Sequence, residues 1–319
     1  MSVEPLATVA LGRTGMEITR VGFGAWAIGG GGWEYGWGPQ DDAESVAAIR
    51  RALELGVNWI DTAAAYGFGR SERVVAEALQ GLERRPYVFT KASLVDDGTG
   101  RVLHRLTRDS LLREVHASLE RLRIDAIDLY QIHWPVPDED IEEGWATFAE
   151  LKEQGLVRHI GVCNFDVDQL KRAEQIAPVE TLQPPYSLIE RSVEPEILPH
   201  AHANGLGVIV YSPMGSGLLT GAMTRERITG FADDDWRKTD VDFTEPRLSQ
   251  HLALVERLRV VAARHDTTPG AVAVAWTLRN PAVDGAIVGF RRPDQVDPVI
   301  AAATLRLTDD DVAEIEREA

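Results

Sequence analysis

The sequence predicts an α/β protein folded as a (β/α)8 TIM barrel with an N-terminal β-hairpin, long rim loops and extra C-terminal helices. Three observations indicate this fold class. Short apolar runs alternate with segments of helical periodicity, eight such runs follow one another, and no linker or change of composition interrupts the 319 residues. Because one α/β barrel routinely reaches this length, we expect a single barrel domain spanning residues 1–319.

The predicted strands are short runs rich in β-branched and aromatic residues. In chain order they are Val21–Gly24, Val57–Asp61, Tyr87–Lys91, Ile127–His133, Val157–Cys163, Glu180–Gln183, Gly207–Tyr211 and Gly285–Val288. Ahead of the first run, residues near Val9 and Met16–Ile18 flank Gly12–Gly15. This pattern predicts a small hairpin that closes one end of the fold.

The segments between the strands carry apolar residues at helical spacing. These are Val46, Ile49 and Leu53; Val74, Val75 and Leu79; Leu111, Val115, Leu119 and Leu122; Trp145, Phe148 and Leu151; Leu170 and Ala173; Ile197 and Leu198; Val272, Val274 and Leu278. Asp41 and Asp42 predict an N-terminal cap for the first helix. Outside the repeat we expect a loop at Gly29–Gly38, a long segment at Ser212–Arg247, an added helix around Leu252–Val261 and a last helix from Asp309.

Three successive predicted strands end on an ionisable residue: Asp61, Lys91 and His133. Tyr66 follows in the loop after Asp61. In a closed parallel barrel these strand ends share one rim, and neighbouring strands lie about 4.8 Å apart, so the four side chains could converge. Alone, each residue is more simply a structural ion pair, a core tyrosine or a satisfied histidine. Together at one rim they indicate a catalytic site.

The chemistry of such a quartet follows from its charges. An ammonium on Lys91 is expected to lower the pKa of the Tyr66 phenol, and Asp61 would keep Lys91 charged. His133 could hydrogen-bond an oxygen on which negative charge develops. The sequence therefore predicts a proton-donating tyrosine beside an oxyanion-stabilising histidine.

Composition excludes several function classes. The net charge of −17 repels nucleic acid and anionic lipid surfaces, and no targeting segment or membrane span is expected. A single cysteine, Cys163, excludes an intrachain disulfide or a cysteine-based zinc cluster, and it fits a cytoplasmic setting. No metal site is expected, since the sequence has no H-E-x-x-H motif, and His200 and His202 lie in a helical segment. The acidic run Asp233–Asp235 is interpreted as a solvated loop.

The segment Gly22–Ala27 fits a loose G-x-G-x-x-A dinucleotide fingerprint. That fingerprint requires a helix to open at once, whereas the glycines Gly29–Gly32 and an aromatic loop follow here. A Rossmann fold is therefore not favoured. The glycines instead suit a crowded rim or the close approach of a ligand.

The catalytic segments resemble those of the aldo-keto reductases. The resemblance runs from Leu11–Gly15 to Ile287–Gly289, and its motifs are Asp61–Gly67, Lys91 and Gln131–Pro135. It implies a cytoplasmic NADP-dependent aldo-keto reductase that reduces aldehydes or ketones to alcohols with NADPH, or alternatively NADH. Tyr66 would be the general acid, tuned by Lys91 and Asp61, and His133 would orient the substrate carbonyl.

Further segments resemble the family's cofactor site. Gly161–Phe165 and Gln183 are similar to the part that holds the nicotinamide carboxamide, with Cys163 in place of the usual serine. Tyr211 would stack on the nicotinamide, and Gly289–Gln295 is similar to the part that grips the adenosine end. The residues expected around the cofactor are Gly24, Ala25, Trp26, Asp61, Asn164, Gln183, Tyr211, Ser212, Pro213, Met214, Gly217, Leu218, Gly289, Arg291, Arg292 and Gln295. The two arginines favour NADPH, because guanidinium groups can bind a ribose phosphate.

The rim aromatics Trp33, Tyr35 and Trp37, with Trp134, either line a substrate pocket for an apolar or aromatic carbonyl or fold down as a plug. Trp33 and Trp134 are the candidate substrate contacts. Two rival functions remain open: a cofactor-binding, redox-sensing regulatory subunit with low turnover, and a sugar-phosphate isomerase or lyase acting through Lys91. The oligomeric state is not legible in the sequence.

Overall fold

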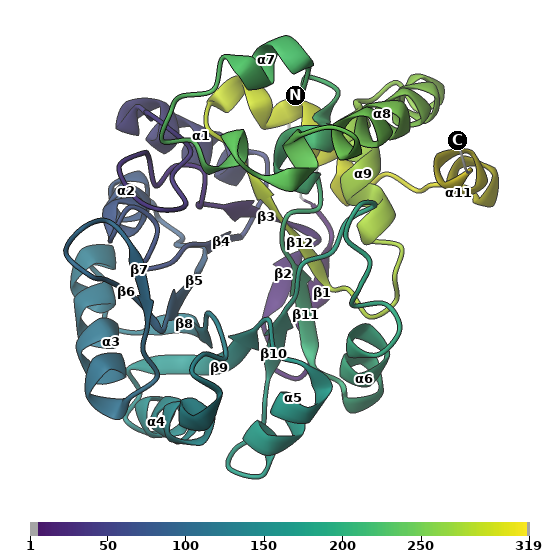
Figure 1. Cartoon of the computed structure of the whole chain (residues 1–319). Coiled ribbons are helices and arrows are strands. Elements are labelled where there is room, and N and C mark those ends of the chain that lie inside the picture. Colours follow the sequence, from purple (N-terminus) through teal and green to yellow (C-terminus); the bar gives the residue numbers. More distant parts are fainter. Residues whose placement is uncertain (1–5, 318–319) are drawn as a thin grey trace.

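The computed structural model describes residues 6–317 and contains a closed barrel of parallel strands surrounded by helices (Figure 1). The barrel strands are β3 (Val21–Gly24), β4 (Trp59–Asp61), β5 (Tyr87–Ala92), β8 (Ile127–Ile132), β9 (Val157–Cys163), β10 (Thr181–Gln183), β11 (Gly207–Val210) and β12 (Gly285–Gly289). They follow one another around the barrel in chain order, and β12 pairs with β3 to close it. The predicted (β/α)8 TIM barrel is confirmed. Its extent over residues 1–319 as one domain stays a prediction, since residues 1–5 and 318–319 lie outside the described part.

The helices predicted between the strands, the added helix and the last helix are present. They are α1 (Asp42–Glu54), α2 (Arg70–Ala78), α3 (Arg108–Leu122), α4 (Ile141–Glu153), α5 (Val167–Glu174), α6 (Ile197–Asn204), α8 (Arg247–Arg264), α9 (Pro269–Thr277) and α11 (Asp309–Glu316). Two short helices, α7 (Arg225–Thr229) and α10 (Asp297–Ile300), were not predicted. Short 3-10 turns lie at Asp138–Asp140, Gly215–Thr220, Trp236–Lys238, Val241–Phe243, Pro293–Gln295 and Ala301–Ala303. As expected, Asp41 caps α1, because its carboxylate accepts the backbone N–H of Glu44 at 3.1 Å.

The N-terminal hairpin closes one end of the barrel. Strands β1 (Thr8–Ala10) and β2 (Glu17–Thr19) pair with Val9 opposite Ile18. Ile18 belongs to an apolar cluster with Trp59 from β4 and Phe89 from β5, and the Trp59 indole donates to the Thr19 carbonyl at 2.8 Å. This end is therefore filled with apolar side chains, which leaves the carboxyl ends of the strands as the polar end.

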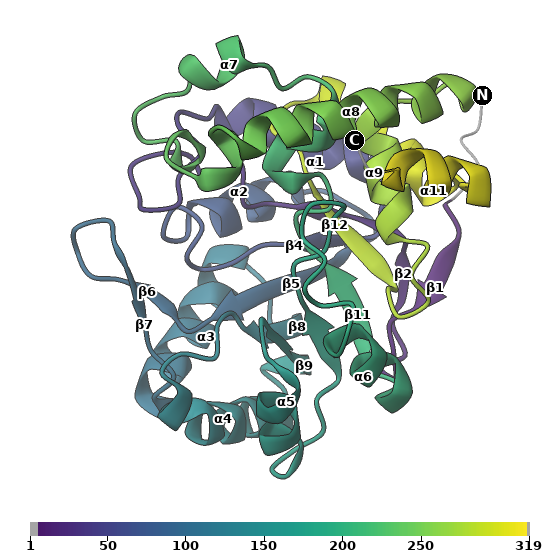
Figure 2. The same cartoon turned by 45° about the vertical axis from the view of Figure 1, so that its right-hand side comes forward.

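A second hairpin was not predicted. Strands β6 (Leu94–Asp96) and β7 (Val102–His104) pair antiparallel between β5 and α3, and Figure 2 shows this hairpin projecting from the barrel beside α3. Each strand has only three residues, too few to give a recognisable alternation in the sequence.

The two long rim loops are joined to each other. Asp234 accepts the backbone N–H of Gly32 at 3.0 Å, and the Trp236 N–H donates to the Gly36 carbonyl at 3.0 Å. Trp37 and Asp235 form an isolated β-bridge. Since both loops follow carboxyl ends of barrel strands, they meet on the polar side of the barrel.

Candidate active site

Lys91 lies at the centre of a buried cluster on the polar rim. Its side chain is 1% exposed, and its ammonium donates to Asp61 Oδ1 at 2.5 Å, to the Thr62 carbonyl at 2.9 Å and to the Tyr66 hydroxyl at 3.4 Å. The barrel register explains the convergence, because β4 and β5 are neighbours and Lys91 lies opposite Gln131 of β8. The structure brings together the acid and the amine that were predicted at successive strand ends and the phenol that was predicted in the loop after Asp61.

Asp61 accepts several hydrogen bonds at once. Besides Lys91, its carboxylate accepts the side-chain amides of Gln183 at 2.9 Å and Gln131 at 3.4 Å. Burial is the largest single influence and lowers the pKa of Lys91, but the Asp61 carboxylate together with the nearby Tyr66 and Cys163 side chains outweighs it, and the pKa is raised above its ordinary value. Lys91 is therefore a fixed positive charge. Gln131 belongs to a segment that the sequence singled out, but its contact with Asp61 was not foreseen.

Tyr66 is buried, and its pKa differs from the expectation. Burial raises the pKa of the phenol to about 12, although the ammonium of Lys91 acts in the opposite direction. The prediction of a lowered pKa is wrong for this structure. Two causes explain the result: the phenolate would lose its hydration, and the Asp61 carboxylate next to Lys91 cancels part of the ammonium's field. Tyr66 therefore keeps its proton throughout the neutral range.

His133 follows the end of β8 and joins the same cluster. Its ring lies edge-on to Tyr66, with 5.7 Å between ring centroids and an interplanar angle of 76°. Burial of the ring, and then the nearby Lys91 charge, lower the pKa of His133 well below its ordinary value. The Nδ1 atom is buried and has no hydrogen-bond partner among residues 6–317. His133 is thus a neutral imidazole with an unused polar atom.

Asn164, directly after β9, links the residues that follow β8 and β11. Its side-chain amide donates to the His133 carbonyl at 2.9 Å, and its oxygen accepts the Tyr211 hydroxyl at 2.8 Å. Cys163, in the last position of β9, is 1% exposed, and burial raises the pKa of its thiol. Asn164 therefore fixes the Tyr211 ring, while Cys163 is an uncharged thiol beside Gln183 in the β9–β10 register.

The end of β3 packs directly on the cluster. Gly24 is its last residue, and the Ala25 N–H donates to the Asp61 carbonyl at 2.9 Å. The Trp26 ring stacks on Tyr66 with 6.4 Å between centroids. Ala25 thus contacts Asp61 directly, Trp26 contacts Tyr66 directly, and Gly24 is the residue before them.

Aromatic side chains cover Tyr66 from the rim loops. Trp33 is buried, and its ring lies 6.3 Å from the Tyr66 ring between centroids. It therefore covers Tyr66 and also forms part of the wall of the candidate site. Trp236 stacks on Trp26 at 5.3 Å and was not foreseen. Trp134, in contrast, is 40% exposed and leaves an apolar ring at the surface.

The acidic run Asp233–Asp235 is not a simple solvated loop. Asp235 is 4% exposed and pairs with Arg237 at 2.6 Å, and the Arg237 guanidinium lies 4.2 Å from the centroid of the Trp37 ring. Of the run, Asp233 alone is fully exposed at its side chain, where it pairs with Lys238. The expectation was wrong for Asp235, because its partner lies in a turn whose fold depends on the opposite rim loop.

The loop after β11 adopts left-handed backbone conformations. Ser212 has a φ of 54° and Gly217 a φ of 99°, and the loop includes the 3-10 turn Gly215–Thr220. The neighbours Pro213, Met214 and Leu218 are buried. These buried side chains anchor the loop, so a ligand here would meet its backbone and the partly exposed Ser212.

The two candidate phosphate-binding arginines differ in their surroundings. Arg291 donates to the Gln40 side chain at 2.6 Å and to the carbonyls of Trp37 and Pro39, which ties the end of the Gly29–Gly38 loop to the segment that follows β12. Arg292 is exposed and pairs with Asp294 at 3.1 Å. Gln295 accepts both arginine backbone N–H groups, at 2.8 and 3.2 Å. Gly289 lies at the exposed end of β12, where an added Cβ would make only ordinary van der Waals contacts, the nearest with the Gly24 carbonyl oxygen at 3.8 Å.

The described part of the chain contains neither a metal-binding group of side chains nor a helix that could span a membrane. Within residues 6–317, no three His, Cys, Asp or Glu side chains are grouped so that they could hold a metal ion. The described part of the chain also has no helix with the length and apolar character needed to cross a membrane.

Comparison with known proteins adds independent information. Residues 20–318 match the model of the aldo/keto reductase family. The chain is 38% identical to the aldo-keto reductase YhdN of Bacillus subtilis over 96% of its length and 91% of that protein. It is 36% identical to the NADH-specific methylglyoxal reductase of Escherichia coli, over 95% of each chain. Among solved structures, the glycerol dehydrogenase AKR11B4 of Gluconobacter oxydans superposes with a TM-score of 0.86 and 36% identity, over 97% of this chain and 94% of that one.

Proposed function

This chain belongs to the aldo/keto reductase family, and we propose that it reduces aldehydes or ketones to alcohols, with Tyr66 as the general acid. The observation that carries this proposal is the buried contact of Lys91 with both Asp61 and the Tyr66 hydroxyl. A cluster of this kind holds a proton donor against a fixed positive charge at the rim where barrel chemistry occurs.

The cofactor is a reduced nicotinamide nucleotide, NADPH or NADH, as in other aldo-keto reductases. The residues present fit such a group. Tyr211 offers a flat ring held by Asn164, and His133 has a buried nitrogen without a protein partner. When bound, the cofactor supplies the hydride for the carbonyl carbon.

The residues of the chain would handle the oxygen and the proton. His133 orients the carbonyl oxygen through a hydrogen bond, and the Tyr66 hydroxyl gives its proton to that oxygen as negative charge develops there. The raised pKa of Tyr66 (about 12) suits this role, because an alkoxide is a much stronger base than a phenolate. Lys91 then stabilises the tyrosinate that remains until solvent returns the proton.

For cofactor choice we propose NADPH over NADH, with Arg292 as the 2′-phosphate contact. Arg292 is exposed and has one surface carboxylate partner, Asp294, whereas Arg291 is engaged by three groups of its own chain. A phosphate could displace a surface partner at little cost. We also propose a cytoplasmic location, because the free thiol of Cys163 suits a reducing compartment.

The substrate side is formed by Trp33 and Trp134, which favours carbonyl compounds with an apolar or aromatic part. The names of two relatives refer to methylglyoxal and glycerol, so methylglyoxal and glyceraldehyde belong in a substrate panel beside aromatic aldehydes.

The test is multiple-turnover oxidation of NADPH and NADH with this panel, for the wild-type protein and for Tyr66→Phe. We expect turnover by the wild type and a loss of about 10²- to 10⁴-fold in the variant, with cofactor affinity unchanged by fluorescence quenching. Unchanged turnover in Tyr66→Phe would remove the tyrosine from its role. Tight cofactor binding without turnover of any carbonyl substrate would instead favour the alternative function, a redox-sensing regulatory subunit.

A further inference from the structure

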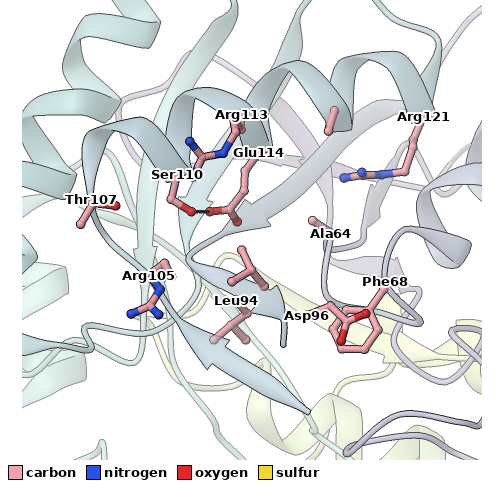
Figure 3. A pocket seen from close by; sticks show the side chains of 12 residues that line it. Ala64, Phe68, Leu94, Asp96, Arg105, Thr107, Ser110, Arg113, Glu114 and Arg121 are labelled. Carbon is pink, nitrogen blue, oxygen red and sulfur yellow. Dashed lines mark hydrogen bonds between the residues drawn. The ribbon is translucent and has the colours of Figure 1, made fainter. Parts of the chain in front are cut away.

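A cavity of about 440 Å³ lies beside the candidate active site, between α3, the β6–β7 hairpin and the loop that carries Tyr66 (Figure 3). Its apolar wall includes Phe68 and Leu94, and its polar wall includes Arg105, Arg113 and Glu114. None of these residues has a part in the proposed reduction. The cavity is large enough for a small organic molecule.

Two of the arginines in this cavity have no carboxylate partner. Arg105 and Arg113 are exposed, and neither forms an ion pair with any residue between 6 and 317. In Figure 3 they lie on two sides of the Ser110–Glu114 pair. A third arginine, Arg121, also lines the cavity, but its charge is compensated by Glu72 at 2.5 Å.

Glu114 is a buried carboxyl group in the cavity wall. It is 8% exposed, and it accepts the Ser93 backbone N–H at 3.0 Å and the Ser110 hydroxyl at 3.0 Å. Burial raises the pKa of Glu114 to about 7, although the two serine contacts and the nearby Arg121 and Arg113 act to lower it. The carboxyl therefore changes its charge close to neutral pH.

The other acidic groups around Glu114 are already engaged or cannot ionise near neutral pH. Asp96, on β6, accepts the backbone N–H groups of Gly98 and Gly100 at 2.8 and 3.2 Å, so it is used by the hairpin turn. Tyr130, on β8, is buried, and burial raises the pKa of its phenol. Glu114 is therefore the group whose protonation changes the charge of the cavity.

We propose that this cavity is a second ligand site for a small organic oxyanion, bound by Arg105 and Arg113, and that Glu114 takes up a proton when the oxyanion binds. The guanidinium groups supply charge-assisted hydrogen bonds, and Phe68 and Leu94 offer an apolar surface to the body of the ligand. An ionised Glu114 would repel an anion, whereas the neutral acid removes that repulsion and adds a donor.

The site lies next to the catalytic strand end. Ser93, whose N–H binds Glu114, is two residues beyond Lys91 and has a φ of 87°, a conformation that serine rarely adopts. Its hydroxyl oxygen accepts the Trp134 backbone N–H at 3.3 Å. The charge of Glu114 thus acts on the backbone that follows both Lys91 and His133.

The first test measures binding by isothermal titration calorimetry, with sodium sulfate and with phenyl sulfate as ligands. The charges of both anions do not change near neutral pH. Titrations are run with and without saturating NADP⁺, which keeps sulfate out of a nucleotide phosphate site. We expect binding under both conditions, tighter for phenyl sulfate, and weakened about tenfold by Arg113→Ala or Arg105→Ala. The matched control is Arg73→Ala, which removes an exposed, unpaired arginine of α2 outside the cavity.

The second test uses pH. We expect sulfate to bind more tightly as the pH falls from about 8 to about 6, with net proton uptake measured in buffers of different ionisation enthalpy. In Glu114→Gln the affinity should be pH-independent and equal to the wild-type value at low pH. The amide fits the site, since its oxygen can accept the Ser93 N–H and its nitrogen can donate to Ser110. Circular dichroism checks the fold of each variant.

Absence of sulfate binding, equal weakening by Arg73→Ala, or an unchanged pH dependence in Glu114→Gln would overturn the proposal. None of these results depends on carbonyl reduction, because no substrate is present. A failure of the proposed reductase activity would therefore be distinguishable from a failure of this site.

Discussion

Replacement of Asp61 by asparagine tests the electrostatic core of the candidate site. The wild-type carboxylate accepts hydrogen bonds from Lys91 at 2.5 Å, Gln183 at 2.9 Å and Gln131 at 3.4 Å. An asparagine of the same shape keeps one acceptor oxygen and turns an NH₂ group toward a donor. Since Lys91 is 1% exposed, water cannot replace the lost partner, and the ammonium is left buried without a counter-charge.

The size of the effect follows from this burial. Removal of one partner of a buried ion pair costs about 3–5 kcal/mol of unfolding free energy near pH 7. In the variant, Lys91 can escape the cost by losing its proton, so its folded pKa falls below the unfolded value of about 10.4. A lowered lysine pKa destabilises the fold increasingly as the pH falls below the unfolded value, by about 1.4 kcal/mol for each pH unit.

The wild type behaves in the opposite way. Its Lys91 pKa is raised, so the stabilisation is complete below the unfolded pKa and is lost only as the pH rises through the folded pKa. Between about pH 7 and about pH 9.5 the titration of Lys91 thus leaves the unfolding free energy of the wild type unchanged. Over the same range the variant regains up to about 3 kcal/mol of unfolding free energy. Turnover should fall at both values, because Tyr66 loses its charged neighbour or its alignment.

The assay is urea unfolding followed by circular dichroism at both pH values. Asp128→Asn is a matched control, because Asp128 is also 1% exposed but pairs with Arg85 and Arg158, whose side chains are 32% and 58% exposed. These arginines stay hydrated and do not titrate, so the loss in the control should be the same at both pH values. A loss in Asp61→Asn that is equally independent of pH, or below about 1 kcal/mol, would refute the reasoning.

Three further outcomes are expected. In the free protein, an ultraviolet difference titration of wild type against Tyr66→Phe should show no tyrosinate from Tyr66 until the pH approaches 12; a signal near the ordinary value would contradict the buried, raised pKa. Arg292→Ala should weaken NADPH about tenfold more than NADH, whereas Arg291→Ala should weaken both, because it releases the Gly29–Gly38 loop; equal losses in Arg292→Ala would count against a 2′-phosphate contact. Trp134→Ala should raise the KM for an aromatic aldehyde up to about tenfold relative to methylglyoxal, and a parallel rise for both would remove Trp134 from substrate recognition.

Much of the fold was readable because its signals are local. Each barrel strand is a short β-branched run with a turn after it, and the pairing of Asp61 with Lys91 follows once neighbouring parallel strands end at one rim. Boundaries were less certain, since β4 begins at Trp59 rather than Val57. Residue type and chain order therefore sufficed for the architecture and for the contacts of Lys91 with Asp61 and Tyr66 in the candidate site.

Other features depend on residues far apart in the chain. Trp236 reaches Trp26, and Asp235 forms a β-bridge with Trp37, only because two rim loops meet, and no local pattern reports that meeting. Arg291, a predicted cofactor contact, also binds the Gln40 side chain and loop carbonyls 251 to 254 positions away, and no local pattern predicts those contacts. The hairpin β6–β7 and the cavity beside it also depend on residues that no local sequence pattern identifies.

The sequence by itself determined the barrel, its polar rim and the identity of the residues gathered there, because periodicity and strand order are properties of neighbouring residues. Only the tertiary structure decided how those groups are charged. Tyr66 holds its proton and Glu114 titrates near neutral pH because burial removes water from each group, and burial is set by side chains from the whole fold rather than by the adjoining residues.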